Sequence, residues 1–148
     1  MKVTSIRNAA SFKQTVLLID DQPTVLDIHA AILKSLKANL RIVTMTNPED
    51  ALAWMKNKQI DLVITDYRMH PMDGVSFIKA IRQHSHQPHT SVIVVTIIKD
   101  KIVLQELTAA GATACLAKPV NPDELKKLAQ SLLAKHRQLT TLPTGQTQ

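Results

Sequence analysis

Short apolar runs alternate along this chain with longer segments in which apolar residues recur every three or four positions. The runs are rich in β-branched and aliphatic residues, which is typical of strands that are buried on both faces of a parallel sheet. They predict five strands, at 15–19, 40–45, 61–65, 91–96 and 113–117. The periodic segments predict five helices, at 23–36, 48–57, 75–84, 101–110 and 122–137.

The capping residues support these helices. Asn47 and Asn121 each precede a proline and two acidic residues, so each supplies an N-cap acceptor, a proline at N1 and negative charge in the first turn. Gly111 follows the fourth helix and suits a left-handed C-terminal position. Because crossovers between parallel strands are right-handed, the helices are expected on both faces of the sheet. The predicted fold class is α/β, a doubly wound sandwich with a five-stranded parallel sheet.

The chain length and the pattern together predict one domain. A chain of 148 residues with 45% hydrophobic residues matches the common size of a single domain and can bury a core. The pattern places this domain at residues 15–137, after an N-terminal tail at 1–14. Residues 138–148 are expected to be a C-terminal tail or the start of a linker.

The end of the last helix has two interpretations. Its leucines continue at a spacing of three or four residues as far as Leu142, with a break at Lys135, so the helix could extend toward an effector. The alternative is a frayed tail that ends at Pro143.

The net charge of +6 does not indicate nucleic-acid binding once the charges are located. Residues 15–125 hold all 12 acidic residues and 11 of the 18 basic ones, a balance of 11 − 12 = −1. The excess positive charge therefore lies in the flanking segments, where no aromatic residue is interleaved for base stacking. We expect no direct nucleic-acid partner.

The apolar runs are far shorter than the roughly 20 residues of a membrane span, and the first residues lack the apolar region of a secretory signal. The single Cys115 cannot form an internal disulfide and is expected to be a small buried hydrophobe rather than a redox sensor. These features predict a cytoplasmic protein without a membrane partner.

Polar residues lie at or just after the ends of four predicted strands. Asp20 and Asp21 follow the first, Asp66 follows the third, Thr96 ends the fourth and Lys118 follows the fifth. The carboxyl ends of parallel strands lie at one edge of the sheet, where ligands of such folds bind. Three carboxylates there would repel one another without a cation, and their hard oxygen ligands suit Mg²⁺ or Mn²⁺. With Lys118 and Thr96 to bind phosphoryl oxygens, the edge is predicted to accept a phosphoryl group.

These and other polar residues also have simpler interpretations. The three acids could be capping and turn residues of an ordinary α/β protein. A functional site is favoured because a threonine and a lysine are expected at the same edge of the sheet. His84, His86 and His89 could bind a metal, yet they lie in a loop at the opposite edge, where solvated side chains are expected.

Four motifs carry a resemblance to a known family. They are the pair Asp20-Asp21, the segment DLVITDYRMHPMDG at 61–74, the threonine of VIVVTIIKD, and the Lys-Pro of AGATACLAKPV. With these motifs in this order, residues 15–137 resemble the receiver domain of two-component response regulators. The resemblance implies a flavodoxin-like (βα)₅ fold.

The resemblance also implies a role for each site residue. Asp66 would be the phosphoacceptor, Asp21 a direct metal ligand, Asp20 a ligand through water, and the backbone carbonyl of Arg68 a further metal contact. Mg²⁺ or Mn²⁺ would be the cofactor.

Lys118 would bind Asp66 and the phosphoryl oxygen, and Thr96 would move in to hydrogen-bond the phosphoryl group. The donor would be a phosphohistidine of a sensor histidine kinase, and the change would pass to an effector protein or a fused output domain, with a phosphorylation-dependent dimer left open. Such a domain is a signalling switch and not an enzyme, apart from assisting its own phosphorylation and slow dephosphorylation.

Three positions depart from the family pattern. His70, followed by Pro71, stands where a proline is usual; Ile97 follows the switch threonine where a small residue is usual; and Cys115 replaces an aromatic residue. These departures keep a second interpretation open, a pseudo-receiver that acts as an interaction module independent of phosphorylation.

A narrower resemblance extends over TDYRMHPMDG and VTIIKDKIVLQELTAAGATACLAKPVNPDEL. Both segments are similar to receivers fused to HD-GYP cyclic di-GMP phosphodiesterase domains. The 148 residues hold only the receiver-like region. A receiver excised from such a protein and a stand-alone relative both stay open.

Overall fold

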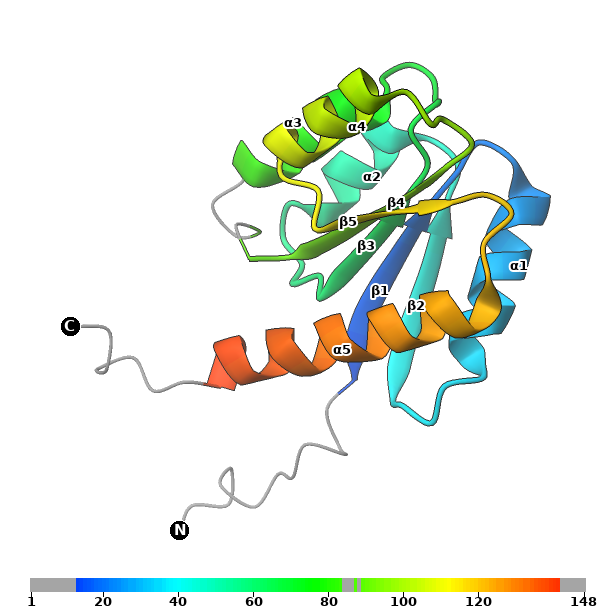
Figure 1. Cartoon of the computed structure of the whole chain (residues 1–148). Coiled ribbons are helices and arrows are strands. Elements are labelled where there is room, and N and C mark those ends of the chain that lie inside the picture. Colours follow the sequence, from blue (N-terminus) through cyan, green and yellow to red (C-terminus); the bar gives the residue numbers. More distant parts are fainter. Residues whose placement is uncertain (1–12, 84–86, 88, 142–148) are drawn as a thin grey trace, which may run out of the picture.

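The computed structural model describes residues 13–83, 87 and 89–141. Within them, five strands and five helices alternate as the sequence predicts (Figure 1). The strands are β1 (Gln14–Ile19), β2 (Leu40–Met45), β3 (Leu62–Thr65), β4 (Ser91–Thr96) and β5 (Ala114–Ala117). The helices are α1 (Pro23–Lys34), α2 (Pro48–Met55), α3 (Gly74–Gln83), α4 (Lys101–Ala110) and α5 (Pro122–Thr141).

The five strands form one parallel sheet in the order β2-β1-β3-β4-β5. The register determines which residues meet beyond the strand ends. Ile19 is paired with Thr65, so the residues that follow them, Asp20 and Asp66, leave neighbouring strands at the same level. Thr96 is paired with Ala117, so the residue after Ala117 emerges beside the end of β4.

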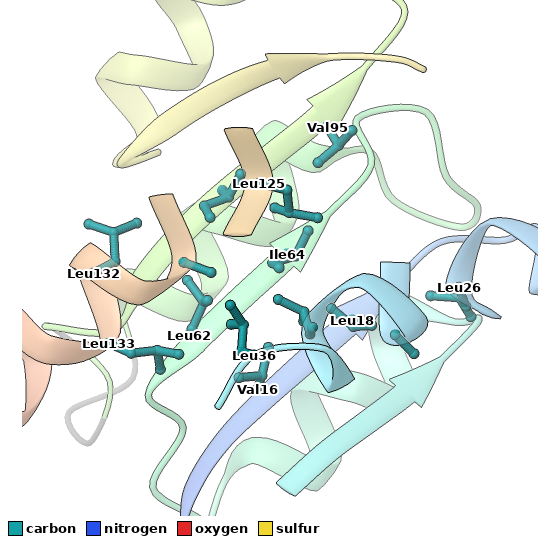
Figure 2. Close-up of a cluster of buried hydrophobic side chains, with 14 residues drawn as sticks. Val16, Leu18, Leu26, Leu36, Leu62, Ile64, Val95, Leu125, Leu132 and Leu133 are labelled. Carbon is teal, nitrogen blue, oxygen red and sulfur yellow. The ribbon is translucent and has the colours of Figure 1, made fainter. Parts of the chain in front are cut away.

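Helices cover both faces of the sheet, which confirms the predicted doubly wound sandwich. Helices α1 and α5 cover one face, and α2, α3 and α4 cover the other (Figure 1). Alternate residues of β1 enter the two cores, Val16 and Leu18 on the first side, Leu17 and Ile19 on the second. Figure 2 shows the first of these cores, between the sheet and helices α1 and α5.

The helix caps agree with the sequence prediction. The Asn47 side chain accepts hydrogen bonds from the backbone N–H groups of Glu49 and Asp50, and Asn121 accepts from Glu124 N–H at 3.0 Å. Gly111 ends α4 with φ of 116°, in the left-handed region that favours glycine.

Helix α5 is longer than predicted and runs to Thr141 instead of Arg137. The extension follows the leucine spacing, which continues past Arg137 to Leu139. Polar contacts hold the distal part of the helix, since the buried His136 places Nδ1 2.8 Å from Asp61 Oδ1 and Arg137 donates to the side chain of Gln14 at 2.7 Å. Helix continuation is therefore observed as far as Thr141, whereas Leu142 and Pro143 lie outside the described residues.

Polar side chains connect the loops at the amino edge of the sheet, opposite the acidic residues. Arg82 donates to the carbonyl oxygens of Thr90 and Gly111, and Gln87 donates to those of Met55 and Lys58. These contacts tie the segments before β3, β4 and β5 together. At the same edge His89 is exposed, and His84 and His86 lie outside the described residues.

In the part of the chain that the structure describes, no helix is long and apolar enough to cross a membrane.

Candidate functional site

The structure brings three predicted acidic residues together at the carboxyl edge of the sheet. Asp20, Asp21 and Asp66 each place a carboxylate oxygen within 4.8 Å of the others. Asp20 is buried, with 2% of its surface exposed, whereas Asp66 is partly buried and Asp21 is exposed. One side of the group therefore faces solvent while the other is enclosed by the sheet.

Lys118 bridges two of these carboxylates. Its Nζ lies 2.8 Å from Asp20 Oδ2 and 3.0 Å from Asp66 Oδ2. Its backbone N–H donates to the carbonyl oxygen of Thr96 at 3.0 Å, which continues the pairing of β4 and β5 and directs the lysine to the strand ends. Burial alone would lower the pKa of Lys118, but the hydrogen bonds and charges of the two aspartates raise it above its ordinary value. The ammonium group is therefore a fixed positive charge in the site.

Backbone N–H groups hold the remaining oxygens of the same two carboxylates. Gln22 N–H donates to Asp20 Oδ1 at 2.9 Å, and Tyr67 N–H donates to Asp66 Oδ1 at 2.7 Å. Each carboxylate thus has one oxygen on a backbone amide and one on Lys118. This arrangement orients both side chains before any ligand arrives.

Two other predicted site residues lie near this group without bonding to it. The buried hydroxyl of Thr96 accepts a hydrogen bond from Ile98 N–H at 3.1 Å, and within the described residues it makes none to the three carboxylates. Arg68 is exposed in the loop after β3. Its carbonyl as a metal contact stays a prediction.

The three positions that depart from the family pattern differ in their surroundings. Ile97 is 64% exposed just after β4, and His70 is exposed in the loop after β3. Cys115 is half-buried beside the core formed with α2, α3 and α4, and burial raises the pKa of its thiol. A thiol with a raised pKa suits the predicted role of a small hydrophobe better than that of a redox sensor.

Sequence reasoning missed two polar residues beside the site. Thr65 ends the otherwise aliphatic β3, and its hydroxyl donates to the carbonyl oxygen of Asp66 at 2.9 Å. His29 is a buried imidazole on α1, only 6% exposed. A lone polar residue in an apolar strand or on the apolar face of a helix is the signal that could have indicated each.

The environment of His29 predicts a pH-dependent loss of stability. Burial lowers the pKa of His29, the charge of Lys118 lowers it further, and Asp20 and Asp66 oppose this effect. Because the folded-state pKa lies below the unfolded value of about 6.5, the unfolded chain binds more protons as the pH falls below 6.5. The free energy of unfolding should decrease over that range. His29→Leu should remove part of this decrease.

Urea unfolding at several pH values between 5 and 8 would measure the effect. His70→Gln, at an exposed histidine, is the control and should keep the parental pH profile. If His29→Leu also kept that profile, proton binding to His29 would not contribute to it.

Comparison with known proteins bears directly on this geometry. The sequence model of the response regulator receiver domain matches residues 16–130. The chain belongs to the response regulator receiver domain family. This confirms the resemblance drawn from the strand-end residues, and the receiver fold accounts for the position of the acidic group.

Two curated relatives show how much of a longer protein this receiver represents. The cyclic di-GMP phosphodiesterase response regulator RpfG of Xanthomonas campestris pv. campestris is 29% identical over 123 residues, which are 83% of this chain and 32% of the relative. The putative two-component response regulator ARR13 of Arabidopsis thaliana is 34% identical over 149 residues, covering 97% of this chain and 25% of the relative. The chain spans about a third or less of the length of these two proteins.

A solved structure confirms the fold class. The chemotaxis response regulator CheY4 of Vibrio cholerae superposes with a TM-score of 0.74 at 30% sequence identity, covering 82% of this chain and 99% of that one. The similarity extends over nearly the whole of a protein that consists of this fold. The predicted flavodoxin-like (βα)₅ architecture is therefore correct.

Proposed function

We propose that this receiver accepts a phosphoryl group from a sensor histidine kinase on Asp66, with Mg²⁺ or Mn²⁺ as cofactor, and relays the change to an effector protein or a fused output domain. The observation that carries the proposal is the placement of the Asp66 carboxylate. It is partly exposed, belongs to a group of three acids and shares Lys118 with Asp20. Membership in the receiver family supports the same role.

In the proposed reaction, a carboxylate oxygen of Asp66 attacks the phosphorus of a phosphohistidine. The new O–P bond forms as the P–N bond breaks, and the leaving imidazole takes up a proton. Lys118, already 3.0 Å from Asp66 Oδ2, would bind a phosphoryl oxygen. The Thr96 hydroxyl would leave Ile98 N–H and turn toward the phosphoryl group.

The residues present fit a hard divalent cation. Three carboxylates supply oxygen ligands, and the exposed side of Asp21 leaves room for coordinated water. The buried Asp20 would contact the ion through water, whereas the exposed Asp21 would bind it directly. The carbonyl of Arg68 would complete the protein ligands. When bound, the ion would supply positive charge to offset the negative charge of the carboxylates and the phosphoryl oxygens.

In this role the chain would be a signalling domain of the cytoplasm and not an enzyme acting on an external substrate. Its partners would be the kinase and the effector, with a phosphorylation-dependent dimer as one form of output and no direct nucleic-acid contact. The receiver would span residues 15–137, and the described part of α5 beyond it would begin a linker. In a longer protein, an output activity such as that named for RpfG would belong to a separate domain.

Intact-mass measurement would test the proposal. The protein is incubated with a small phosphodonor in Mg²⁺ and, as a control, in EDTA. A gain of one phosphoryl group in Mg²⁺ alone is expected, together with amide shifts at the carboxyl edge of the sheet when beryllium fluoride replaces the donor. If neither the mass gain nor these shifts appear, the result supports the pseudo-receiver instead.

Ile97→Ala should accelerate loss of the phosphoryl group. The isoleucine side chain is 64% exposed just after Thr96 and would restrict the approach of water to the phosphoryl group. Its truncation is expected to raise the dephosphorylation rate about threefold, equivalent to about 0.7 kcal/mol in the barrier. The decay of phosphorylated protein after donor removal would measure it.

Ile28→Ala is the matched control, since Ile28 is an isoleucine on α1 that is 53% exposed. It should leave the decay rate unchanged. Equal rates in the parent and both variants would show that Ile97 does not shield the phosphoryl group.

A further inference from the structure

The hydroxyl of Thr65 contacts the backbone of the proposed phosphoacceptor from within the protein. Thr65 is 1% exposed, and its Oγ1 lies 2.9 Å from the carbonyl oxygen of Asp66 and 3.5 Å from Sδ of the buried Met69. A hydroxyl has one proton to donate, and a carbonyl oxygen is a stronger acceptor than a thioether sulfur. The main bond is therefore the one to Asp66.

This bond determines the orientation of the Asp66–Tyr67 peptide plane. In a planar trans peptide, the carbonyl of one residue and the N–H of the next point in opposite directions. When the Asp66 carbonyl is held by Thr65, the Tyr67 N–H must point to the other side. There it donates to Asp66 Oδ1 at 2.7 Å.

The same peptide is packed closely by the start of α3. Gly74 N–H donates to the Tyr67 carbonyl at 2.7 Å. A Cβ at Gly74 would lie 3.1 Å from the Asp66 carbonyl oxygen and 3.0 Å from Tyr67 Cα. Both atoms belong to the backbone, so they could make room only by moving the peptide itself.

The carboxylate of Asp66 is thus held at both oxygens, Oδ1 by Tyr67 N–H and Oδ2 by Lys118. We propose that Thr65 is a positioning residue for phosphoryl transfer, because its hydroxyl fixes the peptide plane that orients the Asp66 carboxylate. This inference rests on the proposed function of Asp66 and adds a residue to it.

Two substitutions separate the hydroxyl from the shape of the side chain. Thr65→Val keeps the branched shape and removes the hydroxyl, whereas Thr65→Ser keeps the hydroxyl. Thr90→Val is the matched control, since Thr90 is also buried and donates to the Ile60 carbonyl oxygen at 2.8 Å, but at the amino edge of the sheet. It removes a buried hydroxyl without touching the site.

The first measurement is hydrogen exchange and the NMR shift of the Tyr67 amide, which do not depend on phosphorylation. Thr65→Val should show a changed shift and faster exchange at this amide, and Thr65→Ser and Thr90→Val should match the parent. The second measurement is the initial rate of labelling by a small phosphodonor in Mg²⁺. It should fall about tenfold in Thr65→Val and stay within about twofold in the other two variants.

The inference would be overturned if Thr65→Val kept the parental NMR shift and exchange rate of the Tyr67 amide together with the parental labelling rate. An equal loss of labelling in Thr90→Val would also overturn it, because this would indicate a general effect of lost stability. If Thr65→Val does not fold, Gly74→Ala tests the same peptide with the hydroxyl in place. It should disturb the Tyr67 amide and slow labelling, and a parental result for both would contradict the proposal.

Failure of the proposed function has a different signature. A parent protein that takes up no phosphoryl group refutes the role of Asp66, while the Tyr67 amide still reports whether Thr65 fixes the peptide.

Discussion

Asp66→Asn is expected to take up no phosphoryl group from a small donor in Mg²⁺, because an amide is nearly isosteric with a carboxylate but is not a comparable nucleophile. Labelling should fall to background. The fold should persist, since the asparagine carbonyl oxygen can accept from Tyr67 N–H in place of Asp66 Oδ1. Loss of one ion pair with Lys118 should cost about 1–2 kcal/mol of unfolding free energy in EDTA.

Intact mass after incubation, with fragment masses to locate the phosphate in the parent, would measure the effect. Asp50→Asn is a suitable control because Asp50 is an exposed acid in the first turn of α2. It should be labelled like the parent. Uptake of a phosphoryl group by Asp66→Asn would show that another residue is the acceptor.

Lys118→Met should give the largest loss of stability, and the loss should depend on metal. In EDTA the substitution leaves the Asp20 carboxylate, whose side chain is 3% exposed, without its ion-pair partner and beside Asp66. Removing one partner of a buried pair typically costs about 3–5 kcal/mol. Mg²⁺ should restore part of this, because a ligand of the native state contributes about 2.7 kcal/mol at one hundred times its dissociation constant.

Urea unfolding in EDTA and in millimolar Mg²⁺ would test both parts. The increase in the free energy of unfolding caused by Mg²⁺ should be larger in Lys118→Met than in the parent, because the lysine no longer competes for the carboxylates. Lys126→Met is the control, since Lys126 pairs at 3.7 Å with the exposed Asp123 on the surface of α5 and should lose less than about 1 kcal/mol. Equal losses in the two variants would mean that Lys118 does not hold the acidic group together.

The architecture was predictable because burial on both faces of a strand and on one face of a helix leaves a periodic pattern in the sequence. Element ends were less predictable because long-range polar contacts determine them. Gln14 is a polar residue, yet it starts β1 because it is buried and donates to the Leu133 carbonyl of α5 at 2.9 Å. Asp61 was predicted as a strand residue, but it precedes β3 and accepts from Thr15 N–H at 2.7 Å.

The acidic group was predictable for a different reason. Residues that follow parallel strands must meet at one edge, so Asp20, Asp66 and Lys118 could be placed together from their positions alone. The contribution of Thr65 could not, because it depends on the direction of one peptide plane and not on a periodic pattern. The electrostatic coupling of His29 to the acids was equally unpredictable, because their separation along the sequence does not reveal it.

The polar contacts that join α5 to the start of β1 have a practical consequence for immobilising the protein. Gln14 bonds to Leu133 and Arg137, so the described chain starts and its last helix leaves at the amino edge. The carboxylates lie at the other edge, roughly 20 Å away along a six-residue strand. A sensor surface or a fluorescent partner attached beyond either end would therefore leave the acidic group facing the solution, where a phosphodonor can reach it.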